Sequence, residues 1–179
     1  MTRESLPQIS PEQLAERLDR GESLQILDVR APDKVASGHI ALGSELDFHA
    51  HPSSQLVALP DLSTLHLDTT RPIAVVCGRG NSSKKATAFL RERGYEAYSV
   101  IGGMAAWETV YVAHQLSPTP SLSHVVQLDR VGKGALSYVV VSDGDAVIVD
   151  PGRHVERYDA LLTELHATPA AVVDTHIHA

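Results

Sequence analysis

The residue best placed for chemistry is Cys77, the single cysteine among 179 residues. It directly follows the apolar run at residues 73–76 and opens a short glycine-containing segment, after which a helical pattern begins near Ser83. In open α/β sheets, ligands bind at the carboxyl ends of the strands. The order of strand, cysteine, glycine-rich turn and helix therefore predicts a thiol at the functional edge of a sheet.

The residues after the cysteine favour an ionised thiol. Gly78 and Gly80 allow the backbone to curl so that successive N–H groups face inward as an anion-binding nest, and the following helix points its positive end at the same place. Both effects stabilise a thiolate and lower the pKa of the cysteine. Arg79, Lys84 and Lys85 add positive charge that would attract a small anion. A buried free cysteine that packs as a small apolar side chain is the alternative interpretation.

A cysteine-dependent phosphatase also uses an anion loop that begins with cysteine. That chemistry needs an arginine six residues after the cysteine, where the guanidinium holds phosphate through two parallel hydrogen bonds. Position 83 is serine in this chain, so the loop disfavours phosphate ester hydrolysis.

Alternating strand and helix patterns predict the elements that position this loop. Ser10, Pro11 and Gln13 form a helix start with a capping box. Strand-type runs and helical patterns then alternate along the chain, whereas residues 46–71 predict a loop with at most one short helix. The predicted strands span 25–29, 73–76 and 97–101, and the predicted helices span 83–93 and 103–111. This alternation predicts an α/β fold with a parallel sheet flanked by helices.

A second region follows a stretch without periodicity. Residues 116–123 carry two prolines and predict an interdomain linker between a domain at 1–115 and a segment at 124–179. Within that segment, Asp143 and Gly144 form a hairpin signal between two apolar strands, and a helix with one apolar stripe follows. A last strand leads to His176 and His178.

Composition limits the partners. The formal net charge is -7 and the sequence pI is about 5.7, which argues against nucleic acid or an anionic membrane surface as a partner. A single cysteine excludes an internal disulfide, and no apolar run is long enough to span a membrane. These features predict a cytoplasmic protein.

Three motifs in order resemble the rhodanese family over about residues 8–114. They are Asp28-Val29-Arg30 with Gly38-His39-Ile40, then the loop from Cys77 to Ser83, then Gly94-Tyr95 with Gly102-Gly103-Met104 and Trp107. The resemblance implies a sulfurtransferase that needs no cofactor. Its donor would be a small anion such as thiosulfate or a persulfide, its acceptor a thiol, and its intermediate a Cys77 persulfide.

The resemblance also implies the roles of other residues. The anion-binding loop would comprise Gly78, Arg79, Gly80, Asn81, Ser82 and Ser83. Asp28 and Arg30 would support it as a structural ion pair. Many active rhodaneses carry arginine where this chain has Ser82. A catalytically silent rhodanese-like binding module is therefore the alternative function.

The second region resembles the opening of the metallo-β-lactamase superfamily, an αββα fold. The likeness lies in residues 137–141, in Asp150-Pro151-Gly152 and in the pair His176 and His178, which match the start of an H-x-H-x-D-H motif. It implies zinc or iron in a complete parent domain, with hydrolase or persulfide dioxygenase activity. We expect the segment in this chain to be truncated within the motif, and to associate through the apolar surface that truncation exposes.

Overall fold

The computed structural model describes residues 5–42 and 46–176. The chain divides into two compact units, Met1–Val110 and Tyr111–Ala179. None of the helices in the described residues is both long and apolar enough to cross a bilayer.

The first unit is built on a five-stranded parallel sheet with the strand order β1-β5-β4-β2-β3. The strands are β1 (Gln8–Ile9), β2 (Gln25–Asp28), β3 (Asp47–Ala50), β4 (Ile73–Val76) and β5 (Ala97–Val100). Every residue of β2 and of β4 is buried, as expected for central strands covered on both faces. The predicted α/β fold with a parallel sheet is confirmed.

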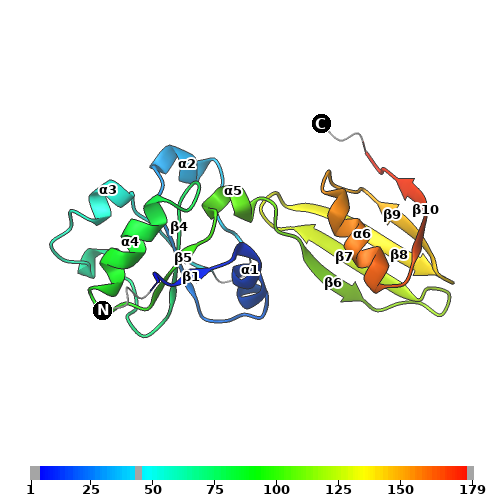
Figure 1. Ribbon diagram of the computed structural model, residues 1–179, viewed down its shortest axis with the longest axis horizontal. Coiled ribbons are helices and arrows are strands. Elements are labelled where there is room, and N and C mark those ends of the chain that lie inside the picture. Colours follow the sequence, from blue (N-terminus) through cyan, green and yellow to red (C-terminus); the bar gives the residue numbers. More distant parts are fainter. Residues whose placement is uncertain (1–4, 43–45, 177–179) are drawn as a thin grey trace. The chain divides into compact units, whose positions relative to one another are not determined.

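Helices cover both faces of this sheet. Figure 1 shows α3 and α4 on one face and α1 and α5 on the other, and each of these helix pairs is in contact. The helices are α1 (Pro11–Asp19), α2 (Pro32–Ala36), α3 (Ser53–Leu56), α4 (Ser82–Arg91) and α5 (Gly103–Trp107), with a 3-10 turn at Ser63–Leu65. On the α3 and α4 face, a buried cluster includes Leu56, Val75, Leu90 and Cys77 itself. The thiol therefore lies at the edge of a packed core.

The strand β3 corrects the prediction for residues 46–71. That stretch contains β3, which pairs with β2 in parallel register, and α3 as well as the 3-10 turn. Its sequence, Asp-Phe-His-Ala, has no apolar run, because an edge strand has one paired side and no requirement for burial on both faces. The segment is a strand because it pairs with β2, although its own sequence shows no strand pattern.

The second unit is a mixed five-stranded sheet with the order β10-β9-β8-β7-β6. The strands from β6 to β9 pair with one another in antiparallel order. The helix α6 (Val155–Glu164) connects β9 to β10, which pairs with β9 in parallel. The strands are β6 (Val112–Leu116), β7 (His124–Arg130), β8 (Ala135–Ser142), β9 (Asp145–Val149) and β10 (Thr168–Val173). Asp143 and Gly144 both have positive φ, at 49° and 85°, which the primed hairpin turn between β8 and β9 requires.

The structure places the division between units earlier than the predicted linker at 116–123. The boundary falls after Val110, and β6 pairs with β7 in the second unit. Residues 117–123 therefore join two paired strands, and the Ser123 amide donates to the Val141 carbonyl at 2.7 Å. Prolines and missing periodicity mark a loop, but they carry no information about whether the flanking segments pair with each other.

The two faces of this second sheet differ. One face packs on α6 through a buried cluster that contains Val139, Ile148 and Leu162. On the other face, paired positions form an apolar row across all five strands: Leu116, Val125, Val140, Val147 and Ala171. Leu116 in this row is 38% exposed. Association through the apolar row stays a prediction.

The capping box predicted for α1 is present and gives a stability test. The Gln13 amide donates to Ser10 Oγ, and the Ser10 amide donates to Gln13 Oε1, both at 3.1 Å. We expect Ser10→Ala to lower the free energy of unfolding of the first unit by about 1 kcal/mol, because the helix loses one capped amide. Urea denaturation measures the change. Ser54→Ala, at an exposed position of α3, is the matched control and should have little effect.

Candidate active site

Cys77 lies immediately after β4, at the carboxyl edge of the parallel sheet. Its side chain is buried, with 4% of its surface exposed. The Gly80 amide donates to Cys77 Sγ at 3.1 Å, and the Ser83 hydroxyl lies 3.4 Å from the same sulfur. The sequence-predicted nucleophile, Gly80 and Ser83 are therefore brought together around one sulfur atom.

The helix α4 begins within this loop. Its first residue is Ser82, and Asn81 occupies the N-cap without a side-chain capping bond. The amides of the first turn, which have no acceptor within the helix, and the positive end of the helix dipole thus lie at the cysteine end of α4. Gly80 has φ of 82°, in the left-handed region that favours glycine, and this curl directs its amide at the sulfur.

Two opposing influences act on the pKa of the Cys77 thiol. Burial raises the pKa, because it penalises the charged form. The Ser83 hydroxyl and the backbone amides of Ser83, Arg79 and Gly80 lower it. The hydrogen bonds together outweigh burial, and the pKa lies below its ordinary value. This places the loop among environments that favour the thiolate.

A turn from another element holds the loop in place. The amide of Met104 donates to the Cys77 carbonyl at 2.8 Å, and the amide of Ala105 donates to the Gly78 carbonyl at 3.1 Å. Gly103 touches the loop backbone so closely that a Cβ there would lie 2.2 Å from the Cys77 carbonyl oxygen. Met104 and Trp107 are buried core residues, as predicted, but the sequence-based interpretation missed this backbone clamp. The adjacent glycines at 102 and 103 were its signal.

Asp28 and Arg30 form the predicted ion pair beside the loop. Arg30 Nη2 lies 2.6 Å from Asp28 Oδ2, and the same guanidinium nitrogen donates to the Gly38 carbonyl at 2.6 Å. The Asp28 side chain is fully buried. The Val29 amide donates to the Val76 carbonyl at 2.8 Å, so the pair stands at the end of the strand next to β4. Its contacts fit a role in shaping the sheet edge.

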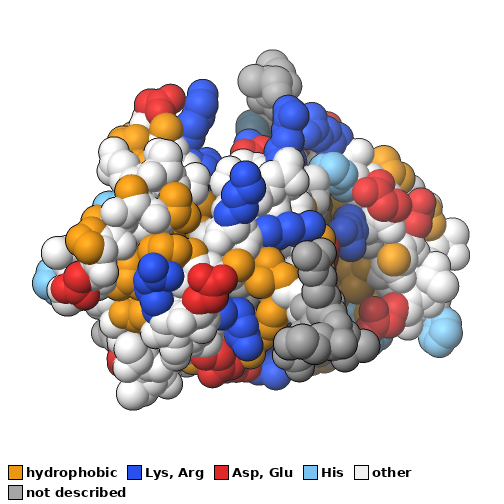
Figure 2. All heavy atoms as spheres, turned by 60° about the vertical axis from the view of Figure 1, so that its left-hand side comes forward, with side chains coloured by type: hydrophobic (Ala, Val, Ile, Leu, Met, Phe, Trp, Pro, Cys, Tyr) orange, Lys and Arg blue, Asp and Glu red, His pale blue; other side chains and the backbone are white. Residues whose placement is uncertain are grey.

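The remaining loop residues are exposed. Gly78, Arg79, Asn81 and Ser82 face solvent, as do Lys84 and Lys85 in the first turn of α4. From position 69 to position 91 the sequence contains basic residues and no Asp or Glu. Figure 2 turns the α3 and α4 side of Figure 1 toward the reader and shows Lys and Arg side chains among apolar ones on this face. Local charge at the cysteine is thus opposite in sign to the net charge.

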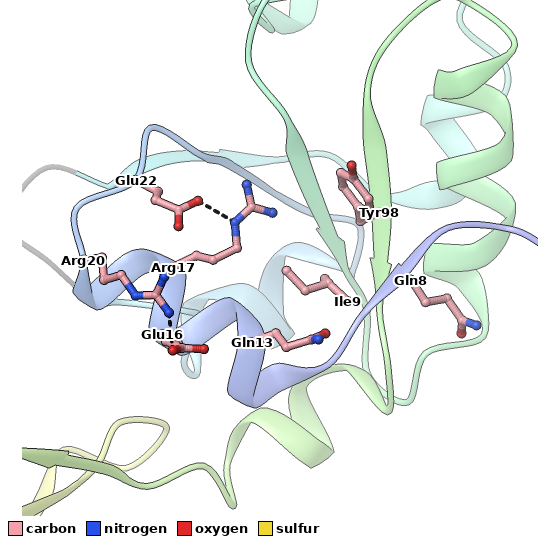
Figure 3. A pocket seen from close by; sticks show the side chains of 8 residues that line it. All are labelled: Gln8, Ile9, Gln13, Glu16, Arg17, Arg20, Glu22 and Tyr98. Carbon is pink, nitrogen blue, oxygen red and sulfur yellow. Dashed lines mark hydrogen bonds and ion pairs between the residues drawn. The ribbon is translucent and has the colours of Figure 1, made fainter.

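A hollow of about 380 Å³ lies elsewhere in the first unit (Figure 3). Its lining comes mainly from β1, α1 and β5: Gln8, Ile9, Gln13, Glu16, Arg17, Arg20, Glu22 and Tyr98. Arg17 pairs with Glu22 at 2.6 Å, and Arg20 pairs with Glu16. Because both guanidinium groups already face carboxylates, this hollow is poorly suited to an anionic substrate.

The predicted metal residues are only partly described. His178 lies outside the described residues. His176 Nδ1 is 3.0 Å from Thr175 Oγ1 and 3.7 Å from Asp150 Oδ1, and its side chain is 65% exposed. The Asp150 carboxylate accepts from the Thr175 amide at 2.6 Å and thus fixes the loop after β10. Across residues 5–42 and 46–176, no group of three or more His, Cys, Asp or Glu side chains could hold a metal ion. The described residues do not fit a zinc or iron site.

Comparison with known proteins agrees with the geometry of the first unit. The family model for the rhodanese-like domain matches residues 10–109. A thiosulfate sulfurtransferase GlpE of Pseudomonas aeruginosa is 33% identical over 111 residues, which cover 62% of this chain and 91% of that protein. The protein of the same name from Pseudomonas putida is 37% identical over 106 residues, covering 59% and 87%.

A solved structure of a rhodanese-related protein from Thermoplasma volcanium also matches. It is 29% identical, with a TM-score of 0.47, and the match covers 56% of this chain and 89% of that one. A parallel sheet with a cysteine loop at its carboxyl edge is the geometry that the match to the rhodanese-like family model leads one to expect. The chain belongs to the rhodanese-like family through residues 10–109.

Replacing Gly103 tests the clamp on the cysteine loop. Gly103→Ala should destabilise the first unit and slow alkylation of Cys77, because the new methyl group would overlap the Cys77 carbonyl. A left-handed backbone alone costs alanine about 1–2 kcal/mol, and the overlap adds to it. Gly94→Ala is the matched control, since Gly94 also has positive φ but has no atom within 4 Å of an added Cβ. Equal effects of the two substitutions on unfolding and alkylation would contradict the clamp.

Proposed function

We propose that this protein is a sulfurtransferase that moves sulfane sulfur from thiosulfate or a persulfide to a thiol acceptor through a persulfide on Cys77. The observation that carries the proposal is the convergence of two groups on Cys77 Sγ: the Gly80 amide, which donates to the sulfur at 3.1 Å, and the Ser83 hydroxyl, which lies 3.4 Å from it. The relatives named thiosulfate sulfurtransferase support the class of reaction. No cofactor enters this reaction.

The chemistry is a two-step covalent transfer. The Cys77 thiolate attacks the outer sulfur of thiosulfate, a new S–S bond forms, and sulfite leaves with the electron pair of the broken S–S bond. The product on the protein is a persulfide anion. An acceptor thiolate then attacks the terminal sulfur, takes it as its own persulfide and releases the Cys77 thiolate. The loop N–H groups would stabilise the persulfide anion as well.

The charge around the loop favours an anionic donor. Arg79, Lys84 and Lys85 are exposed near the mouth of the site, although the chain as a whole is acidic. Positive charge at the mouth raises the local concentration of an anion and speeds its association. Arg79 would supply charge that many rhodaneses take from an arginine at the position of Ser82.

A catalytically silent binding module is the competing function. It shares the fold and the family match, and Ser82 in place of arginine is its main support. The two functions differ in the reactivity of Cys77. A silent module predicts a thiol that accepts no sulfur, whereas the transferase predicts a stable covalent intermediate.

Intact mass distinguishes these two functions directly. After incubation with thiosulfate and removal of excess reagent, we expect the protein to gain the mass of one sulfur atom, and a thiol such as glutathione to remove it. Cys77→Ser should gain nothing. Absence of the added sulfur with both thiosulfate and glutathione persulfide would favour the silent module.

Removal of one positive charge tests the role of the basic residues. Lys84→Gln should lower kcat/KM for thiosulfate by roughly two- to fivefold at low ionic strength, and the difference should shrink in high salt because the charges are screened. Arg20→Gln removes the same charge from an exposed position of the first unit that pairs with Glu16, and it should have little effect. Equal effects of the two substitutions would argue against local attraction of the donor.

For the second unit, we propose the opening part of a metallo-β-lactamase-like domain. Its support is the order of a hairpin, a crossover helix and a strand that leads to His176, together with Asp150, which holds the loop before that histidine. In metallo-β-lactamase-like domains, zinc or iron would serve a hydrolase or a persulfide dioxygenase. The open apolar face of the sheet is the surface through which such a segment would associate.

A further inference from the structure

Ser83 and Ser99 connect Cys77 to the interior of the sheet. Cys77 Sγ lies 3.4 Å from Ser83 Oγ, and Ser83 Oγ lies 2.8 Å from Ser99 Oγ. Both serine side chains are fully buried, and they come from different elements, α4 and β5. Three polar side-chain atoms therefore form a continuous chain of contacts that starts in β5 and ends at the sulfur.

The position of Ser99 is unusual for a hydroxyl. Ser99 pairs with Val75 in the parallel register of β4 and β5, where strands are covered on both faces and apolar side chains prevail. A buried hydroxyl without a partner costs free energy, so it is retained where it has a hydrogen bond to make. The hydroxyl of Ser99 makes that hydrogen bond with Ser83.

The charge on the sulfur decides which atom donates in each hydrogen bond between Cys77, Ser83 and Ser99. A hydroxyl carries a single hydrogen. When the sulfur is anionic it can only accept, so Ser83 must donate to Cys77 Sγ and its own oxygen is free to accept from Ser99. When the sulfur is a neutral thiol, it can donate to Ser83, and Ser83 then donates to Ser99. The anionic sulfur therefore requires the arrangement in which both hydroxyls point toward it.

We infer that Ser99 is a positioning residue for the sulfur chemistry at Cys77: it donates to Ser83 and so holds the Ser83 hydroxyl in the orientation that donates to the anionic sulfur. Ser99 does not touch the sulfur and acts through Ser83. Polarised chains of hydrogen bonds in a buried setting strengthen one another. The inference rests on the proposed function for its biological meaning, because the Cys77 thiolate is the nucleophile that takes up sulfur in that proposal.

Alkylation of Cys77 by iodoacetamide as a function of pH tests the inference without any sulfur transfer. The thiolate is the reactive form, so a site that stabilises it less well alkylates more slowly at neutral pH. We expect Ser99→Ala to slow alkylation roughly three- to tenfold at pH 7 and to shift the whole pH profile to higher pH. The rate at high pH, where the thiol is fully ionised, should stay close to that of the unaltered protein.

An isosteric pair separates the hydroxyl from packing. Ser99→Thr and Ser99→Val add nearly the same volume to β5, so a difference between them reports the hydroxyl even if both lower stability. We expect the Thr variant to keep the original pH profile and the Val variant to show the shifted one. Thr87→Val is a further control, because the buried hydroxyl of Thr87 in α4 has no hydrogen-bond partner among the described residues, and its loss should not move the profile.

A double substitution tests whether Ser99 acts through Ser83. Ser83→Ala should shift the profile by at least as much as Ser99→Ala, and adding Ser99→Ala to Ser83→Ala should produce no further shift. An unchanged profile in Ser99→Val, or shifts that simply add, would overturn the inference. Mass gain from thiosulfate is read separately. A protein that shows the coupled shifts but takes up no sulfur would refute the proposed function and leave the role of Ser99 standing.

Discussion

The hydrogen bond from the Gly80 amide to Cys77 Sγ depends on a loop backbone that curls inward, and the rest of the site depends on that curl. Gly80 adopts a positive φ, and Gly103 packs against the loop at a distance that no side chain tolerates. Amides of α5 then bind the loop carbonyls. The loop conformation that directs the Gly80 amide at the sulfur is thus held by contacts within the protein itself.

Burial raises the pKa of the Cys77 thiol, whereas hydrogen bonds from neutral groups lower it. A nearly buried thiolate would be costly in an apolar core. The Ser83 hydroxyl and the loop amides lower the pKa of the thiol and so offset that cost with neutral groups. The basic side chains of Arg79, Lys84 and Lys85 are exposed to solvent.

In the second unit, too, hydrogen bonds fix a loop at the end of a strand. Asp150 has a positive φ and uses its carboxylate to fix the loop that follows β10, just as backbone strain and hydrogen bonds fix the cysteine loop. One face of its sheet is covered by α6, and the opposite face carries the apolar row from Leu116 to Ala171 beside a row that contains His114, Gln127 and Tyr138. A sheet in this state is suited to packing against a further layer.

The sequence by itself determined the features that depend on local chemistry. The apolar run before Cys77, the glycines after it and the helix that follows were sufficient to predict a cysteine loop at the end of a parallel strand. The capping box at Ser10 and the primed turn at Asp143 and Gly144 were equally local, because each depends on residues only a few positions apart.

Tertiary structure decided what depends on residues distant in the sequence. The edge strand β3 exists because β2 pairs with it, and the loop at 117–123 joins paired strands because β6 joins the second sheet. The contact between Gly103 and the cysteine loop and the bond between Ser83 and Ser99 bring separate elements together. No local pattern encodes such contacts, since they depend on the packing of strands and helices around a shared core.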